Sequence, residues 1–74
     1  METVRKTYIV DRPKISYIRW VIESYDGMAI VTTINPVDAV IEVKIAPGCE
    51  NLVNELILSL RENEGIKFDL VEQR

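Results

Sequence analysis

The sequence changes from a helical to an extended pattern at Asp26-Gly27, and the other segments can be placed around this change. Before it, apolar residues recur at helical spacing, whereas Met28–Ile34 is rich in β-branched residues. Gly27 suits the left-handed conformation that ends a helix, and Asp before Gly is ordinary turn chemistry. We therefore interpret Asp26 and Gly27 as a structural turn. An acid-base role for Asp26 beside Glu23 is the alternative.

The whole chain reads as four extended and two helical segments in the order β-α-β-β-α-β. The predicted strands are Val4–Val10, Met28–Ile34, Ala39–Ile45 and Ile66–Val71, and the predicted helices are Lys14–Tyr25 and Cys49 to the break at Asn63-Glu64-Gly65. With right-handed crossovers, this order most often gives a four-stranded antiparallel sheet with both helices on one face. We predict a single α+β domain of the ferredoxin-like type over residues 1–74.

Alternation and helical spacing predict which side chains form the core. In the strands these are Val4, Tyr8, Val10, Ala39, Ile41, Val43, Ile45, Ile66, Phe68 and Leu70. In the first helix they are Ile15, Ile18, Val21, Ile22 and Tyr25, and in the second helix Cys49, Leu52, Val53, Leu56, Ile57 and Leu60. Lys6 is a misfit on the inward side of the first strand. Met28–Ile34 is apolar on both faces, and we take its bulkier set, Met28, Ile30 and Ile34, as the inward one.

Trp20 does not fit the apolar stripe of the first helix. It lies roughly 140° from Ile15, which belongs to the stripe. Tyr17 is its neighbour, and Leu58 is a large apolar residue on the polar face of the second helix. Because exposed aromatic residues are enriched at interfaces, we predict that Tyr17, Trp20 and Leu58 form an interface and that the chain is a homodimer. The alternative is that Trp20 packs over its own loops.

Charge is distributed unevenly along the chain. The net charge is −3, yet five basic residues lie in the first nineteen positions. The acidic total argues against nucleic acid as a partner, whereas the local basic patch can hold a small anion. The best candidate site is Asp11, Arg12 and Lys14 at the start of the first helix, where free amides favour a small anionic metabolite. The alternative is that Asp11 caps the helix beside ordinary exposed charges.

The residue types present leave little for catalysis. The chain has no histidine, which excludes His-based triads and His metal sites, and its three glycines stand apart rather than in a phosphate-binding loop. Cys49 shares the apolar stripe of the second helix, which favours a buried structural thiol over a nucleophile. We predict no catalytic residues, no metal, no cofactor and no enzymatic activity. Without an apolar run long enough for a membrane span or signal peptide, we expect a cytoplasmic protein without membrane contact.

Two stretches resemble known families. The turn and strand carrying Tyr25, Asp26, Gly27, Ala29, Val31, Thr32 and Thr33 resemble a small prokaryotic family known only as a domain of unknown function. More distantly, Val10-Asp11-Arg12-Pro13 resembles the start of ACT domains, although Lys14 stands where those domains usually carry glycine. The second resemblance implies a regulatory module that pairs and binds amino acids. We therefore expect a non-catalytic regulatory or metabolite-binding homodimer, with a ligand-free protein-interaction subunit as the alternative.

Overall fold

The computed structural model of the chain describes residues 3–25 and 27–71. Its elements are β1 (Val4–Val10), a 3₁₀ turn η1 (Arg12–Lys14), α1 (Ile15–Glu23), β2 (Ala29–Asn35), β3 (Val40–Ile45), α2 (Glu50–Glu64) and β4 (Phe68–Val71). Asp26 lies outside the described residues. Gly27 adopts a φ of +69°, so the left-handed turn predicted for it is confirmed. No helix in the described part of the chain is long and apolar enough to cross a membrane.

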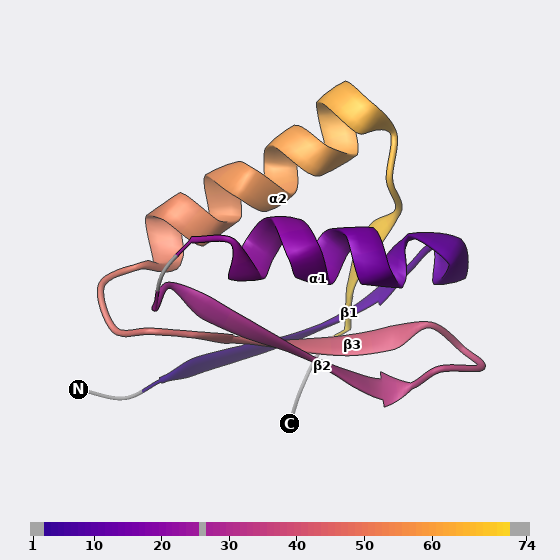
Figure 1. Cartoon of the computed structure of the whole chain (residues 1–74), viewed down its shortest axis with the longest axis horizontal. Helices are drawn as coiled ribbons and strands as arrows, with labels where there is room; N and C mark the ends of the chain where they lie inside the picture. The colour runs from indigo at the N-terminus through magenta and orange to yellow at the C-terminus, as the bar shows by residue number, and fades with distance from the viewer. Residues whose placement is uncertain (1–2, 26, 72–74) are drawn as a thin grey trace.

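The four strands form one antiparallel sheet in the order β2-β3-β1-β4, and both helices cover the same face of it (Figure 1). β1 and β3 are the central strands, and β2 and β4 are the two edges. This is the predicted α+β arrangement of the ferredoxin-like type. The other face of the sheet is not covered by either helix (Figure 1).

The core lies between the sheet and the two helices. Its largest fully buried side chains are Ile18, Ile22, Val31, Ile41, Val43, Ile45, Val53 and Leu60. Each buried aliphatic side chain of this size stabilises the fold by about 1.5–3 kcal/mol relative to exposure. Lys6 also points to the helix side, where its Nζ donates a hydrogen bond to Oδ1 of Asn54 at 3.1 Å. Its aliphatic stem can therefore lie against the core while the charge reaches the surface.

The choice of inward residues in β2 was wrong. Ala29 and Val31 are the buried ones, whereas Ile30 and Ile34 are 60% and 55% exposed. The reason is register: Val31 pairs with Val43 of β3, and directly opposite residues of two strands share a face. Met28 is buried as predicted, but it precedes the strand rather than belonging to it. Side-chain size therefore did not decide the inward face.

Three further residues predicted in the core are exposed. Tyr25 is 52% exposed because α1 ends at Glu23, so Tyr25 does not continue the buried stripe of the helix. Leu52 is 60% exposed because the buried stripe of α2 is centred on Val53, Ile57 and Leu60, and Leu52 lies at its margin. Leu70 pairs with Tyr8 and so shares the helix side of the sheet, yet it is 64% exposed. α2 therefore leaves this end of β4 uncovered.

Candidate functional site

One residue of the predicted anion site at the start of α1, Asp11, is already hydrogen-bonded within the chain. Asp11 Oδ2 accepts a hydrogen bond from the Lys67 backbone N–H at 2.9 Å, and the Asp11 carbonyl accepts one from the Lys14 N–H at 2.8 Å. The side chain of Asp11 makes no capping bond to the turn, so the capping alternative was wrong. The carboxylate of Asp11 is directed instead to the loop before β4. Arg12 and Lys14 are exposed.

Two aromatic side chains of α1 form an exposed surface, here called the aromatic platform. The rings of Tyr17 and Trp20 stack with centroids 6.4 Å apart and an interplanar angle of 26°. Trp20 is 70% exposed, so it does not pack over its own loops. Tyr17 Oη donates a hydrogen bond to Glu64 Oε1 at 2.8 Å, which joins α1 to the end of α2. This hydrogen bond is the main reason that the pKa of Tyr17 is raised.

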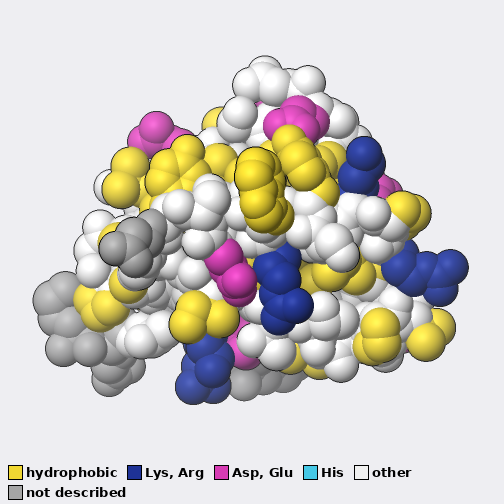
Figure 2. Space-filling view, in the orientation of Figure 1, with side chains coloured by type: hydrophobic (Ala, Val, Ile, Leu, Met, Phe, Trp, Pro, Cys, Tyr) yellow, Lys and Arg dark blue, Asp and Glu magenta, His cyan; other side chains and the backbone are white. Residues whose placement is uncertain are grey.

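Other apolar side chains are exposed on α2 and just after α1. Figure 2 shows hydrophobic side chains gathered over the helices on this face of the molecule. Tyr25 and Leu52, both more than half exposed, line a shallow cleft of about 290 Å³ together with Met28, Glu55 and Leu56. Leu58 is 53% exposed and lines one hollow with residues of β4 and another with its neighbours on α2. The structure therefore brings Tyr17 and Trp20 into contact, while Leu58 shares its hollows with other residues.

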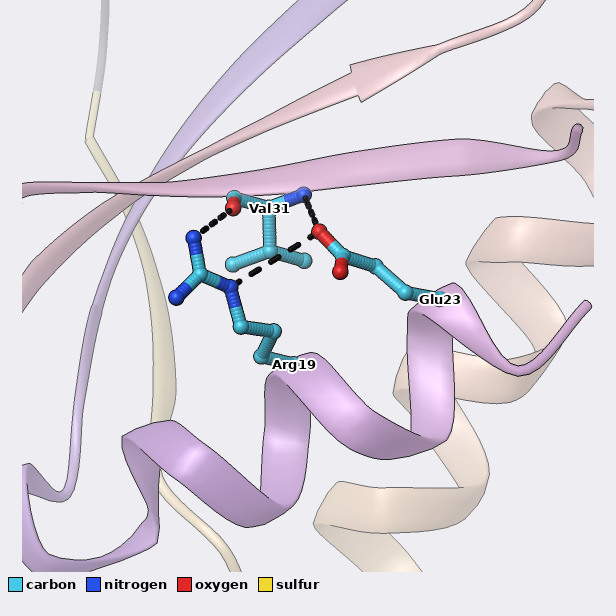
Figure 3. A network of polar contacts seen from close by, with 3 residues as sticks. All are labelled: Arg19, Glu23 and Val31. Carbon is cyan, nitrogen blue, oxygen red and sulfur yellow. Dashed lines mark hydrogen bonds and ion pairs between the residues drawn. The ribbon is translucent and has the colours of Figure 1, made fainter.

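Arg19 and Glu23 of α1 hold the outer edge of β2, a contact that the sequence did not predict (Figure 3). Arg19 Nη2 donates to the Val31 carbonyl at 3.1 Å, and the Val31 N–H donates to Glu23 Oε2 at 2.8 Å. The two side chains also form an ion pair, with Arg19 Nε 3.8 Å from Glu23 Oε2. Their i, i+4 spacing was a signal for the ion pair but not for the strand they contact. We call this arrangement the α1–β2 clamp.

A groove of about 540 Å³ lies between α2 and β4. It is lined by Tyr8, Asn54, Ile57, Leu58, Arg61, Phe68, Asp69 and Leu70. The rings of Tyr8 and Phe68, both part of this lining, meet edge to face with centroids 5.6 Å apart. Burial raises the pKa of Tyr8, and the positive charge of Arg61 opposes that shift. The groove thus combines apolar side chains with the guanidinium of Arg61, the amide of Asn54 and the carboxylate of Asp69.

The remaining groups offer little reactive chemistry. Within residues 3–25 and 27–71, no three His, Cys, Asp or Glu side chains come together to form a metal site. Cys49 is a free thiol, half-buried against the core just before α2. The features that the structure brings together within these residues are the aromatic platform, the α1–β2 clamp and the groove beside β4.

A family model, described as Domain of unknown function (DUF4911), matches residues 8–63, which is more than half of the chain. The chain belongs to the DUF4911 family. The DUF4911 match includes Tyr17, Trp20 and the α1–β2 clamp, while β4 lies beyond it. The family description assigns no activity, and no curated protein or solved structure matches the chain. The predicted resemblance to a domain of unknown function is thus confirmed at the level of the family.

Proposed function

We propose that the domain is a non-catalytic protein-interaction module whose aromatic platform binds a partner protein. The supporting observation is the indole of Trp20, which is 70% exposed and yet stacks on Tyr17. Tyr17 is itself fixed to Glu64 by its hydroxyl group. Trp and Tyr are the residues that most often dominate binding energy at protein interfaces. A platform that is already ordered loses little conformational entropy on binding.

The charges around the platform indicate the kind of partner. Arg19 and Glu23 line a hollow together with Trp20, and Glu64 accepts the hydrogen bond of Tyr17. The complementary partner is a protein whose contact surface is apolar at the centre and carries charges of both signs at the rim. Such complementarity raises the association rate and disfavours partners with the wrong charge pattern.

Binding of a small anionic metabolite by a homodimer, the other function predicted from the sequence, has less support. It depends on Asp11, Arg12 and Lys14, and the carboxylate of Asp11 is engaged by the Lys67 amide. Arg12 and Lys14 remain as two exposed cations on a short 3₁₀ turn. The aromatic platform is the more complete binding surface, because its side chains are held by one another.

The test compares the proteins captured from a cell lysate by the wild-type domain, by Trp20→Ala and by Arg12→Ala. A protein lost only with Trp20→Ala is then purified and titrated. We expect its Kd to rise at least about ten-fold with Trp20→Ala and to stay unchanged with Arg12→Ala. Trp20 is the single tryptophan, so its fluorescence should shift to the blue when the partner covers it. Equal affinity of Trp20→Ala and the wild type would overturn the proposal.

A thermal-shift series with inorganic phosphate separates the metabolite hypothesis from this one. Stabilisation of the wild type by phosphate that disappears in Arg12→Ala and persists in Trp20→Ala would favour the anion site. We expect no such pattern. Because Trp20 is mostly exposed, its replacement by Ala should change the free energy of unfolding by less than about 0.5 kcal/mol, so loss of binding cannot be assigned to misfolding.

A further inference from the structure

The outer edge of β4 has backbone groups with no neighbouring strand. The Val10 N–H donates to the Ala39 carbonyl, so Val10 directs its backbone groups away from β4. By the alternation of antiparallel ladders, Phe68 opposite Val10 and Leu70 opposite Tyr8 also direct theirs away from β1. In the described part of the chain no other element donates to or accepts from these groups. The edge can therefore accept another strand.

The side chains at this edge are arranged so that the strand is complementary to itself. The segment reads Ile66-Lys67-Phe68-Asp69-Leu70. If two copies run antiparallel with Phe68 at the centre, each Lys67 lies opposite an Asp69 and each Ile66 opposite a Leu70. The Ile66 N–H is already bonded to the Leu60 carbonyl, so the bonds between the copies come from the two Phe68 residues and from each Leu70 N–H to the opposite Ile66 carbonyl. Opposite charges directly across two strands stabilise the pairing. We propose that a second copy of this chain adds to β4 in this register and joins two sheets into one.

The charges select this register among those that the backbone allows. Centring the pair on Asp69 would place two carboxylates directly opposite each other, which is destabilising. Centring it on Leu70 would place Asp69 opposite the partner's Val71 and leave Lys67 without an opposing acid. Only centring on Phe68 gives two ion pairs across the two-fold axis.

The residues needed for pairing are accessible in the single chain. The side chains of Lys67 and Asp69 are 49% and 63% exposed, and their charged atoms are 3.7 Å apart. They can therefore join a cluster of four charges without first breaking a buried contact. Leu58 and Leu70, which line the adjoining groove, are 53% and 64% exposed apolar side chains close to the joining edge. This inference uses none of the residues of the aromatic platform and is independent of the proposed function.

Sedimentation equilibrium over a dilution series provides the first test. We expect a reversible dimer for the wild type and for Trp20→Ala. Lys67→Glu places like charges opposite each other twice, and should raise the dimer Kd about ten-fold or more. The exchange Lys67→Asp/Asp69→Lys should restore the dimer. Lys44→Glu on the uncovered sheet face makes the same change in net charge and should have no effect.

Cross-linking tests the register in a Cys49→Ser background. The geometry places residue 67 of one copy and residue 69 of the other as a non-hydrogen-bonded pair, with Cα atoms about 4.5 Å apart, which suits a disulfide. A mixture of Lys67→Cys and Asp69→Cys chains should therefore cross-link, whereas Asp69→Cys alone should not. A monomer at every concentration, a dimer that Lys67→Glu leaves intact, or cross-linking of Asp69→Cys alone would overturn the proposal.

Discussion

The two edge strands of the sheet differ in whether side chains of the neighbouring helix bond to their outward backbone groups. At β2, the outward-facing N–H and carbonyl of Val31 are bonded to Glu23 and Arg19 of α1 (Figure 3). At β4, no such contact reaches the outward backbone groups of Phe68 and Leu70 within the described residues. An exposed edge is a template for pairing with another chain. Two side chains thus occupy the outward backbone groups of Val31 at one edge, whereas those of Phe68 and Leu70 at the other are available for the proposed pairing.

This difference between the two edges depends on the residues that come directly after the buried residues of each helix. In α1, the buried Ile18 and Ile22 are followed by Arg19 and Glu23, about 100° around the helix and toward β2. In α2, the corresponding positions after Val53, Ile57 and Leu60 are Asn54, Leu58 and Arg61. These three line the groove beside β4 without bonding to its backbone. The same helical geometry therefore yields a closed edge or an open groove according to side-chain chemistry.

Proline substitutions should show the largest contrast between the edges. Val31→Pro removes the donor to Glu23 at a fully buried position, and we expect a loss of about 3 kcal/mol or more in the free energy of unfolding. Leu70→Pro removes an N–H that faces outward, and should cost less than about 1 kcal/mol while abolishing the dimer. Urea denaturation measures the loss in the free energy of unfolding for each variant. Val31→Ala is the control for the packing that Val31→Pro also removes. Equal losses at the two edges would contradict the comparison.

Removal of one clamp residue should have an intermediate effect. Glu23→Ala leaves the part-buried Val31 N–H without its acceptor, which should cost about 1–2 kcal/mol. Glu23→Gln keeps an acceptor oxygen and should lose less. Native-state hydrogen exchange should show faster exchange of the Val31 amide in Glu23→Ala. The control is Glu62→Ala on α2, where a change above about 0.5 kcal/mol is not expected.

A smaller loss in the free energy of unfolding should appear at alkaline pH, because Tyr8 beside β4 becomes ionised. The pKa of Tyr8, which packs on Phe68 of β4, is raised by burial above its ordinary value of 10.0. The unfolded chain therefore loses this proton more readily than the folded one. The stabilisation is complete below pH 10 and is lost as the pH rises through the folded pKa.

Urea denaturation between about pH 8 and 11 measures this loss. Tyr17→Phe serves as the background, because the pKa of Tyr17 is raised as well and acts in the same direction. Adding Tyr8→Phe to the Tyr17→Phe chain should make the free energy of unfolding fall less steeply as the pH rises. An unchanged decline would mean that Tyr8 does not cause it.

The fold could be predicted from the sequence because two independent periodicities agree with the observed elements. The alternation of Ile41, Val43 and Ile45 and the helical spacing of Ile18 and Ile22 both identify fully buried residues. The inward face of β2 could not be predicted in this way, since both faces are apolar and only its pairing with β3 decides between them. Leu70 shows a related limit, because alternation predicts its side of the sheet but not whether a helix covers it.

The candidate surfaces were predictable only where a residue violated its local pattern. Trp20 departs from the stripe of α1, and the structure leaves it exposed as that departure indicated. Arg19 and Glu23 fit the amphipathic pattern of α1, because charged residues are expected outside its apolar stripe. Their contact with Val31 depends on how α1 lies across β2, which no local pattern encodes. For the same reason, the use of Asp11 by a residue 56 positions away could not be predicted.

That bond between Asp11 and the Lys67 amide has a consequence for the order of events as the chain is made. It joins the loop after the first strand to the segment before the last, so it forms only after α2 and the turn that follows it have been synthesised. Until then Tyr8 and Val10 lack their neighbours Leu70 and Phe68, and β1 is temporarily an edge strand. The nascent chain is therefore the stage at which this domain is most open to mispairing.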